Sequence, residues 1–109
     1  MTTEHSSSMQ QELDEAKARY KGYCRELRAL GAKRDGLQDL VDLYNAALKR
    51  YQGCSNDFRI AVLDRVYDLE RAVNKVCGEI ERVQSCQDNV GHWILYRELE
   101  QDIEYGITE

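Results

Sequence analysis

The stretch that predicts the fold covers residues 9–51, MQQELDEAKARYKGYCRELRALGAKRDGLQDLVDLYNAALKRY. Its apolar residues recur in steps of four and three, and only Arg34 interrupts the series. The series contains Met9, Leu13, Ala16, Tyr20, Tyr23, Leu27, Leu30, Leu37, Val41, Tyr44, Leu48 and Tyr51. A mean spacing of about 3.5 residues places all of them on one slowly winding helical stripe. The pattern therefore predicts long helices that bury this stripe against other helices.

The composition predicts an all-α fold with a single helical domain over 8–105. The chain has 109 residues and no proline, and helix-forming Leu, Ala, Glu, Arg and Gln are abundant. Without proline nothing forbids long helices, and no segment alternates with the period of two that is typical of a strand. A chain of this length suits one domain with a limited core.

The first helix is predicted over 8–52, after a disordered segment of residues 1–7. Ser8 and Gln11 fit the Ser-x-x-Gln capping box that begins many helices. Gly31 and Gly36 either break this helix near 31–36 or only soften it, at about 1 kcal/mol each. Because the apolar spacing resumes in register after Gly36, a continuous helix is favoured.

A second helix is predicted over 56–84, after a turn around Gly53. Ser55, Asn56 and Asp57 are all suitable N-caps for it. Its apolar face contains Phe58, Val62, Val66, Leu69, Val73, Val76, Ile80 and Val83. The register then slips near Cys86, and the next apolar set is Val90, Trp93, Tyr96, Leu99 and Ile103. Either the second helix kinks there, or a third helix covers 86–105 and leaves a tail of 106–109.

The width of the apolar stripe predicts a partner. Additional apolar rows flank the turn, with Leu40, Leu43 and Ala47 before it and Ile60, Leu63 and Tyr67 after it. A two-helix hairpin leaves such rows exposed. Either the C-terminal helix folds back over them or another chain covers them, and the like charges that fold-back would bring together favour another chain. Trp93 and Tyr96 are added as candidates because Trp and Tyr are enriched at interfaces. The predicted partner-binding residues are therefore Leu40, Leu43, Ile60, Leu63, Tyr67, Trp93 and Tyr96.

The charge of the chain disfavours one class of partner and suggests another. The net charge of −5 disfavours nucleic acid, whose phosphates would be repelled. The basic residues gather in the first half of the chain. Among them, Arg25, Arg28, Lys33 and Arg34 are candidates for binding a small anionic ligand such as a nucleotide.

No catalytic, metal or cofactor site is predicted, so the chain is not expected to be an enzyme. The spacing of Cys77, Cys86 and His92 fits no common zinc motif, and no glycine-rich phosphate loop is present. The N-terminus has no apolar stretch that would form a signal peptide or a membrane span. A cytoplasmic location is therefore expected, in which Cys24, Cys54, Cys77 and Cys86 are reduced thiols.

Two short motifs resemble those of the WXG family of small secreted helical hairpins. They are Tyr51-Gln52-Gly53 near mid-chain, with Tyr where the family has Trp, and Tyr96-Arg97-Glu98-Leu99-Glu100 near the end. The resemblance implies a dimeric hairpin that a specialised secretion system exports, often as the partner of a toxin or effector. Tyr51 and Gly53 would form the turn motif, and Tyr96 and Glu100 the export signal.

The sequence as a whole predicts an antiparallel helical hairpin, coiled-coil-like, that completes a bundle by oligomerisation. The expected function is a non-enzymatic protein–protein interaction module, such as an adaptor, assembly factor or inhibitor. Its partner would be a second copy or another helical protein. The alternatives are the WXG-like secreted partner, and a phage-type counter-defence protein that inhibits a protein or sequesters a small nucleotide.

Overall fold

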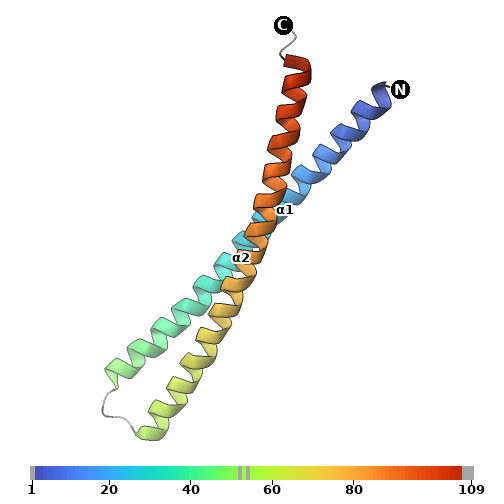
Figure 1. The fold of residues 1–109 in the computed structure, drawn as a ribbon. Helices are drawn as coiled ribbons and strands as arrows, with labels where there is room; N and C mark the ends of the chain where they lie inside the picture. Colours follow the sequence, from blue (N-terminus) through green and yellow to red (C-terminus); the bar gives the residue numbers. More distant parts are fainter. Residues whose placement is uncertain (1, 52, 54, 107–109) are drawn as a thin grey trace. The chain divides into compact units, whose positions relative to one another are not determined.

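The protein is a hairpin of two α-helices. The computed structural model describes residues 2–51, 53 and 55–106, with the side chains of 8–51, 53 and 55–103. Helix α1 spans Thr2–Arg50 and helix α2 spans Asn56–Gly106 (Figure 1). No strand occurs among the described residues. The predicted all-α helical hairpin is therefore confirmed.

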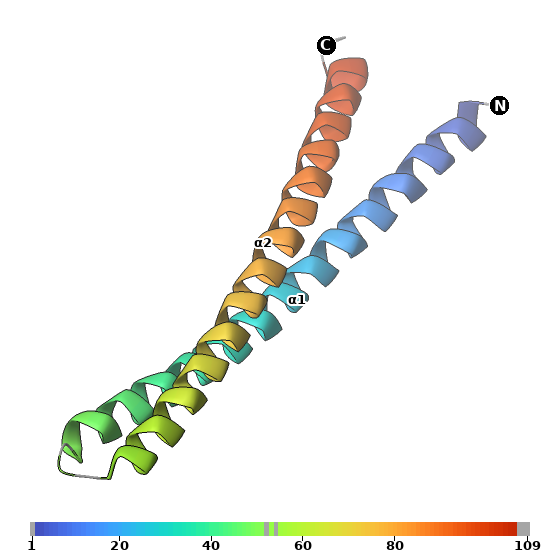
Figure 2. The ribbon, with the colours of Figure 1, turned by 60° about the horizontal axis from the view of Figure 1, so that its bottom comes forward.

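The chain divides into two compact units, each built from one part of each helix. Unit 1 combines Met1–Leu27 with Arg82–Glu109, and unit 2 is Arg28–Glu81. Unit 2 contains the turn, on either side of which the two helices run antiparallel next to each other (Figures 1 and 2).

Helix α1 is continuous through residues 31–36, where the sequence allowed either a break or a continuous helix. Gly31 and Gly36 both lie inside it, and a Cβ atom added at either would meet nothing within 4 Å. Two helical glycines cost about 2 kcal/mol, whereas a break leaves up to four unpaired backbone groups at each new helix end. The helix also begins at Thr2, where residues 1–7 were expected to be disordered. Of that segment, Met1 lies outside the described residues.

Helix α2 is also continuous, so the separate third helix over 86–105 is not present. After Val83 no described residue of α2 is fully buried. Gln87, Val90, Ile94, Arg97 and Gln101 are half-buried in steps of four and three, and Cys86, Trp93 and Glu100 beside them are half-buried as well. Of the apolar set predicted after the slip, Val90 and Trp93 are therefore half-buried, whereas Tyr96, Leu99 and Ile103 are exposed. The helix ends at Gly106, and the rest of the predicted tail, 107–109, is not described.

Ser55 caps α2. The backbone N–H of Phe58 donates to the Oγ atom of Ser55 at 3.4 Å, which satisfies one of the unpaired donors at the helix start. Of the three candidate caps, the structure therefore selects Ser55. Asp57 falls in the first turn, where a carboxylate is stabilised by the positive end of the helix dipole. The predictions that involve Gln52 and Cys54 lie outside the described residues.

The core is thin in both units. In unit 2 a cluster of Val41, Val62, Val66 and Leu69 is buried, and Leu37, Tyr44 and Leu48 pack against it. In unit 1 the buried residues are Leu13, Ala16 and Val83. These residues are the ones that the apolar spacing predicted to face a neighbouring helix. Within the described chain, no helix has the length and apolar character needed to cross a membrane.

Candidate interaction surfaces

Unit 2 exposes two apolar rows beside its core. The first, on α1, contains Leu40 and Leu43; the second, on α2, contains Ile60, Leu63 and Tyr67 and is called the α2 tip row here. The side chains of the α2 tip row are 57%, 52% and 63% exposed. Successive members lie three or four residues apart, so they form one continuous face of the helix.

The two rows lie on opposite sides of the helix pair. Leu40 comes one residue before the buried Val41, whereas Leu63 comes one residue after the buried Val62. When two right-handed helices pack antiparallel, residues one position before the buried residues of the first helix lie on one side of the pair. Residues one position after the buried residues of the second helix lie on the opposite side. The single patch predicted from the sequence is therefore two separate faces.

Charged residues border the α2 tip row at both ends. Asp57 and Arg59 precede it, and Glu70 and Arg71 follow it. All four are exposed, and among the described residues none has an ion-pair partner. The guanidinium of Arg71 lies 5.8 Å from the ring centroid of Tyr67, within the range of a cation–π contact. The row therefore carries an acid and a base at each end.

Near the turn, Tyr51 and Phe58 form an aromatic pair that the sequence did not predict. Their ring centroids are 6.3 Å apart and the rings are almost perpendicular, at 83°. This is the favoured edge-to-face arrangement of two aromatic rings. The sequence contains no signal for it, because the two residues lie on opposite sides of the turn and their approach depends on the tertiary structure.

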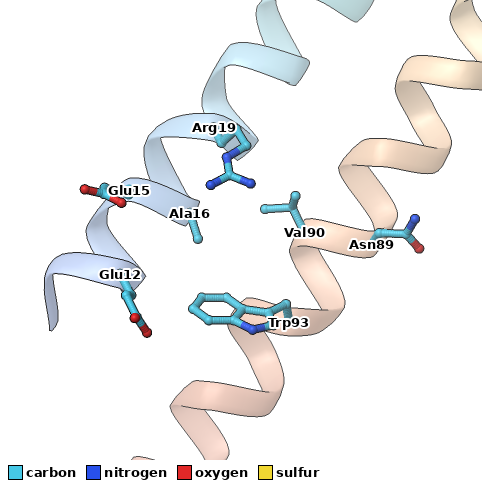
Figure 3. A pocket seen from close by; sticks show the side chains of 7 residues that line it. All are labelled: Glu12, Glu15, Ala16, Arg19, Asn89, Val90 and Trp93. Carbon is cyan, nitrogen blue, oxygen red and sulfur yellow. The ribbon is translucent and has the colours of Figure 1, made fainter. Parts of the chain in front are cut away.

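In unit 1, Trp93 lines a pocket of about 340 Å³ between α1 and α2 (Figure 3). The other lining residues are Glu12, Glu15, Ala16, Arg19, Asn89 and Val90. The indole lies beneath Ala16, and Glu15 points away from α2. The guanidinium of Arg97 lies 5.3 Å from the Trp93 ring centroid and donates to Glu100 at 3.2 Å. Trp93 is thus partly covered within unit 1.

Helix α2 carries an exposed apolar stripe that the sequence did not predict as a surface. It contains Leu95, Tyr96, Leu99 and Ile103, which are 59–66% exposed. Tyr96, Leu99 and Ile103 follow one another in steps of three and four residues and so share one face of α2. Leu95, four residues before Leu99, lies at the edge of this face, next to Lys17, Tyr20 and Lys21 of α1. Tyr96, Leu99 and Ile103 were predicted in the apolar set of the C-terminal segment, and Tyr96 was also predicted as a partner-binding residue. Of the predicted partner-binding residues, only Tyr96 belongs to this stripe.

A second pocket of unit 1, of about 360 Å³, has Lys17, Tyr20, Lys21, Gly91, Ile94 and Leu95 as its lining. At its edge the Nζ atom of Lys17 lies 2.9 Å from Oε1 of Glu98. The hydrogen bond and the charge of Glu98 raise the pKa of Lys17 above its ordinary value. One of the two lysines of this pocket is therefore already engaged by a carboxylate.

The candidate anion-binding residues Arg25, Arg28, Lys33 and Arg34 are all exposed along α1. None of them lines either of the two pockets of unit 1 described above. Arg34 instead donates through Nε to Asp35 at 3.3 Å.

The described cysteines are spread through the hairpin. Cys24, Cys77 and Cys86 are free thiols and half-buried. Cys24 accepts a hydrogen bond from the side-chain amide of Gln87 at 3.0 Å. Within the described chain, His, Cys, Asp and Glu side chains form no group of three or more that could hold a metal ion.

The positions of the two WXG-like motifs fall in different units. Tyr51 and Gly53 lie in the turn, where the N–H of Tyr51 donates to the carbonyl of Ala47 at 3.0 Å. Tyr96 lies on the exposed stripe and Glu100 pairs with Arg97. Comparison with known proteins found no matching family model, curated protein or solved structure.

Proposed function

We propose that the protein is a non-enzymatic interaction module whose exposed apolar faces bind other helices. The observation that carries this proposal is the ratio of exposed to buried apolar residues. Among the described residues, eight hydrophobic side chains are buried, while twelve large hydrophobic side chains are exposed. A contiguous exposed apolar row, such as the α2 tip row, usually marks an interaction site.

A matched pair of variants tests the proposal. In the first, Leu63→Glu and Tyr67→Glu replace two exposed apolar residues of the α2 tip row. In the second, Gln38→Glu and Asn45→Glu add the same charge at exposed polar positions of unit 2. Both variants keep the helical fold because none of the four side chains is buried. The measurement is the native mass of the tagged chain in fresh extract of its host cell, by size-exclusion chromatography with light scattering.

We expect the wild-type chain to elute in a complex, the first variant as a smaller species, and the second like the wild type. If all three elute as the monomer, the chain has no helical partner under these conditions and the proposal is wrong. If the two variants lose the complex equally, added charge and not lost apolar surface is responsible, which also contradicts the proposal.

A further inference from the structure

We infer that the α2 tip row pairs with the same row of a second copy, with the two α2 helices antiparallel. This inference rests on the proposed function and names the partner of one of its faces. The charges at the ends of the row carry it. Asp57 lies before the row and Arg71 lies fourteen residues later, four helical turns away on the same side of α2.

Antiparallel pairing about a two-fold axis near Asp64 places Asp57 of each copy opposite Arg71 of the other. Both ion pairs form at once, because the spacing of about 21 Å between the two residues is the same in the two helices. Along the other long side of the row the order of charges is reversed, with Arg59 first and Glu70 eleven residues later. The same axis places Arg59 opposite Glu70 of the second copy, so both borders are self-complementary.

The apolar residues between these charges match in the same arrangement. Ile60 of one copy meets Tyr67 of the other, and the two copies of Leu63 meet beside the axis. All three side chains are more than half exposed in the single chain, so their burial provides the apolar part of the contact. A parallel arrangement would instead place Asp57 against Asp57 and Arg71 against Arg71, which is repulsive.

One residue opposes the pairing. Asp64 lies on the same border as Asp57 and Arg71, close to the proposed axis, and would face Asp64 of the second copy. Two like charges near a two-fold axis weaken association. Four turns of one helix also form a smaller contact than the ~800 Å² per partner of a standard interface. We therefore expect a reversible dimer that dissociates at roughly micromolar concentration.

A charge-reversal experiment tests the inference with the purified full chain. In Asp57→Arg every copy presents Arg against Arg71, and in Arg71→Asp every copy presents Asp against Asp57. Sedimentation equilibrium should show that each variant alone dimerises about tenfold or more weakly than the wild type. An equimolar mixture should recover the dimer, because an Asp57→Arg chain and an Arg71→Asp chain form both ion pairs with each other.

Three further chains complete the design. Asp64→Asn should dimerise more tightly than the wild type, since it removes the like-charge contact. Leu99→Glu, on the exposed stripe of unit 1, should dimerise like the wild type. Asp57→Asn, which removes the ion pair with little change of shape, replaces Asp57→Arg if circular dichroism shows that the charge reversal disturbs the start of α2, and it should weaken the dimer.

A wild-type chain that stays monomeric up to millimolar concentration overturns the inference, and so does a mixture that stays as weak as its two components. The proposed function is judged separately by the native mass in host extract. A chain that is monomeric when pure, yet loses a host complex on substitution of Leu63 and Tyr67, retains the proposed function. In that case the row binds a different protein and the second-copy inference is wrong.

Discussion

Tyr20 of α1 lies directly against Gly91 of α2 within unit 1. A Cβ atom built on Gly91 would lie 3.2 Å from Cε2 of the Tyr20 ring, closer than an ordinary van der Waals contact. For Gly22, Gly31, Gly36 and Gly78, such an atom would meet nothing within 4 Å. Among these five helical glycines, Gly91 is therefore the one whose missing side chain leaves room for a neighbour.

This relationship predicts different outcomes for two glycine-to-alanine substitutions. Gly36→Ala should stabilise the fold by up to about 1 kcal/mol, because alanine has the higher helix propensity and the site is open. Gly91→Ala should gain less or destabilise, since the half-exposed Tyr20 ring must move. Chemical denaturation followed by circular dichroism gives both free energies of unfolding. An equal gain for the two variants would show that Tyr20 does not constrain Gly91.

The core of unit 2 predicts a contrast between two leucines. Leu69 is 7% exposed and Leu43 is 65% exposed. Leu69→Ala should lower the free energy of unfolding by about 2–5 kcal/mol, because it removes buried surface and leaves a cavity. Leu43→Ala should change it by less than about 0.5 kcal/mol under conditions where the chain is monomeric. Thermal and urea denaturation at low protein concentration measure both effects, and similar losses would contradict the assigned burial.

We expect the half-buried polar residue Gln87 to limit the stability of unit 1. Its amide donates to the Cys24 sulfur, which is a weak acceptor. Gln87→Leu should raise the melting temperature, since it adds apolar burial between neighbours that are largely apolar, at the loss of one weak hydrogen bond. The matched control is Gln84→Leu, three residues earlier and exposed, which should leave the melting temperature nearly unchanged. A lower melting temperature for Gln87→Leu would show that the amide is required there.

The Lys17–Glu98 ion pair predicts a dependence on pH and salt. Because Glu98 raises the pKa of Lys17, the folded state favours the charged amine. The contribution of the pair is therefore fully present below the ordinary lysine pKa of about 10.4 and is lost as the pH rises through the raised value. The stability difference between the wild type and Lys17→Met should be constant from neutral pH to about pH 9 and shrink above that ordinary value. High salt should also reduce the difference, since both side chains are exposed.

Lys21→Met is the control for that experiment, because Lys21 is exposed and has no ion pair among the described residues. Its stability difference from the wild type should show no comparable loss over the same pH range. A difference for Lys17→Met that grows as the pH rises above 10 would contradict the sign of the pKa shift.

The sequence by itself determined the all-α hairpin and the core of unit 2, and it left the continuity of both helices open. Residues such as Val41 and Leu69 recur every three or four positions, so any helix that contains them has an apolar stripe to bury, whatever its partner. The turn was equally readable, since Ser55 supplies the capping oxygen that the start of a helix needs. These features depend on interactions between residues that are close together in the sequence, so the sequence alone is enough to predict them.

Only the tertiary structure decided which residues lie on the surface. In unit 1 the half-buried positions of α2 include the polar Gln87, Arg97 and Gln101, whereas the apolar Leu99 and Ile103 are exposed, so hydrophobicity alone misplaced part of the stripe. In unit 2 the antiparallel direction of the helices placed Leu40 and Leu63 on opposite sides. The physical reason is the same in both units. Exposure depends on where the second helix lies around the first, and this is fixed by contacts between residues far apart in the sequence.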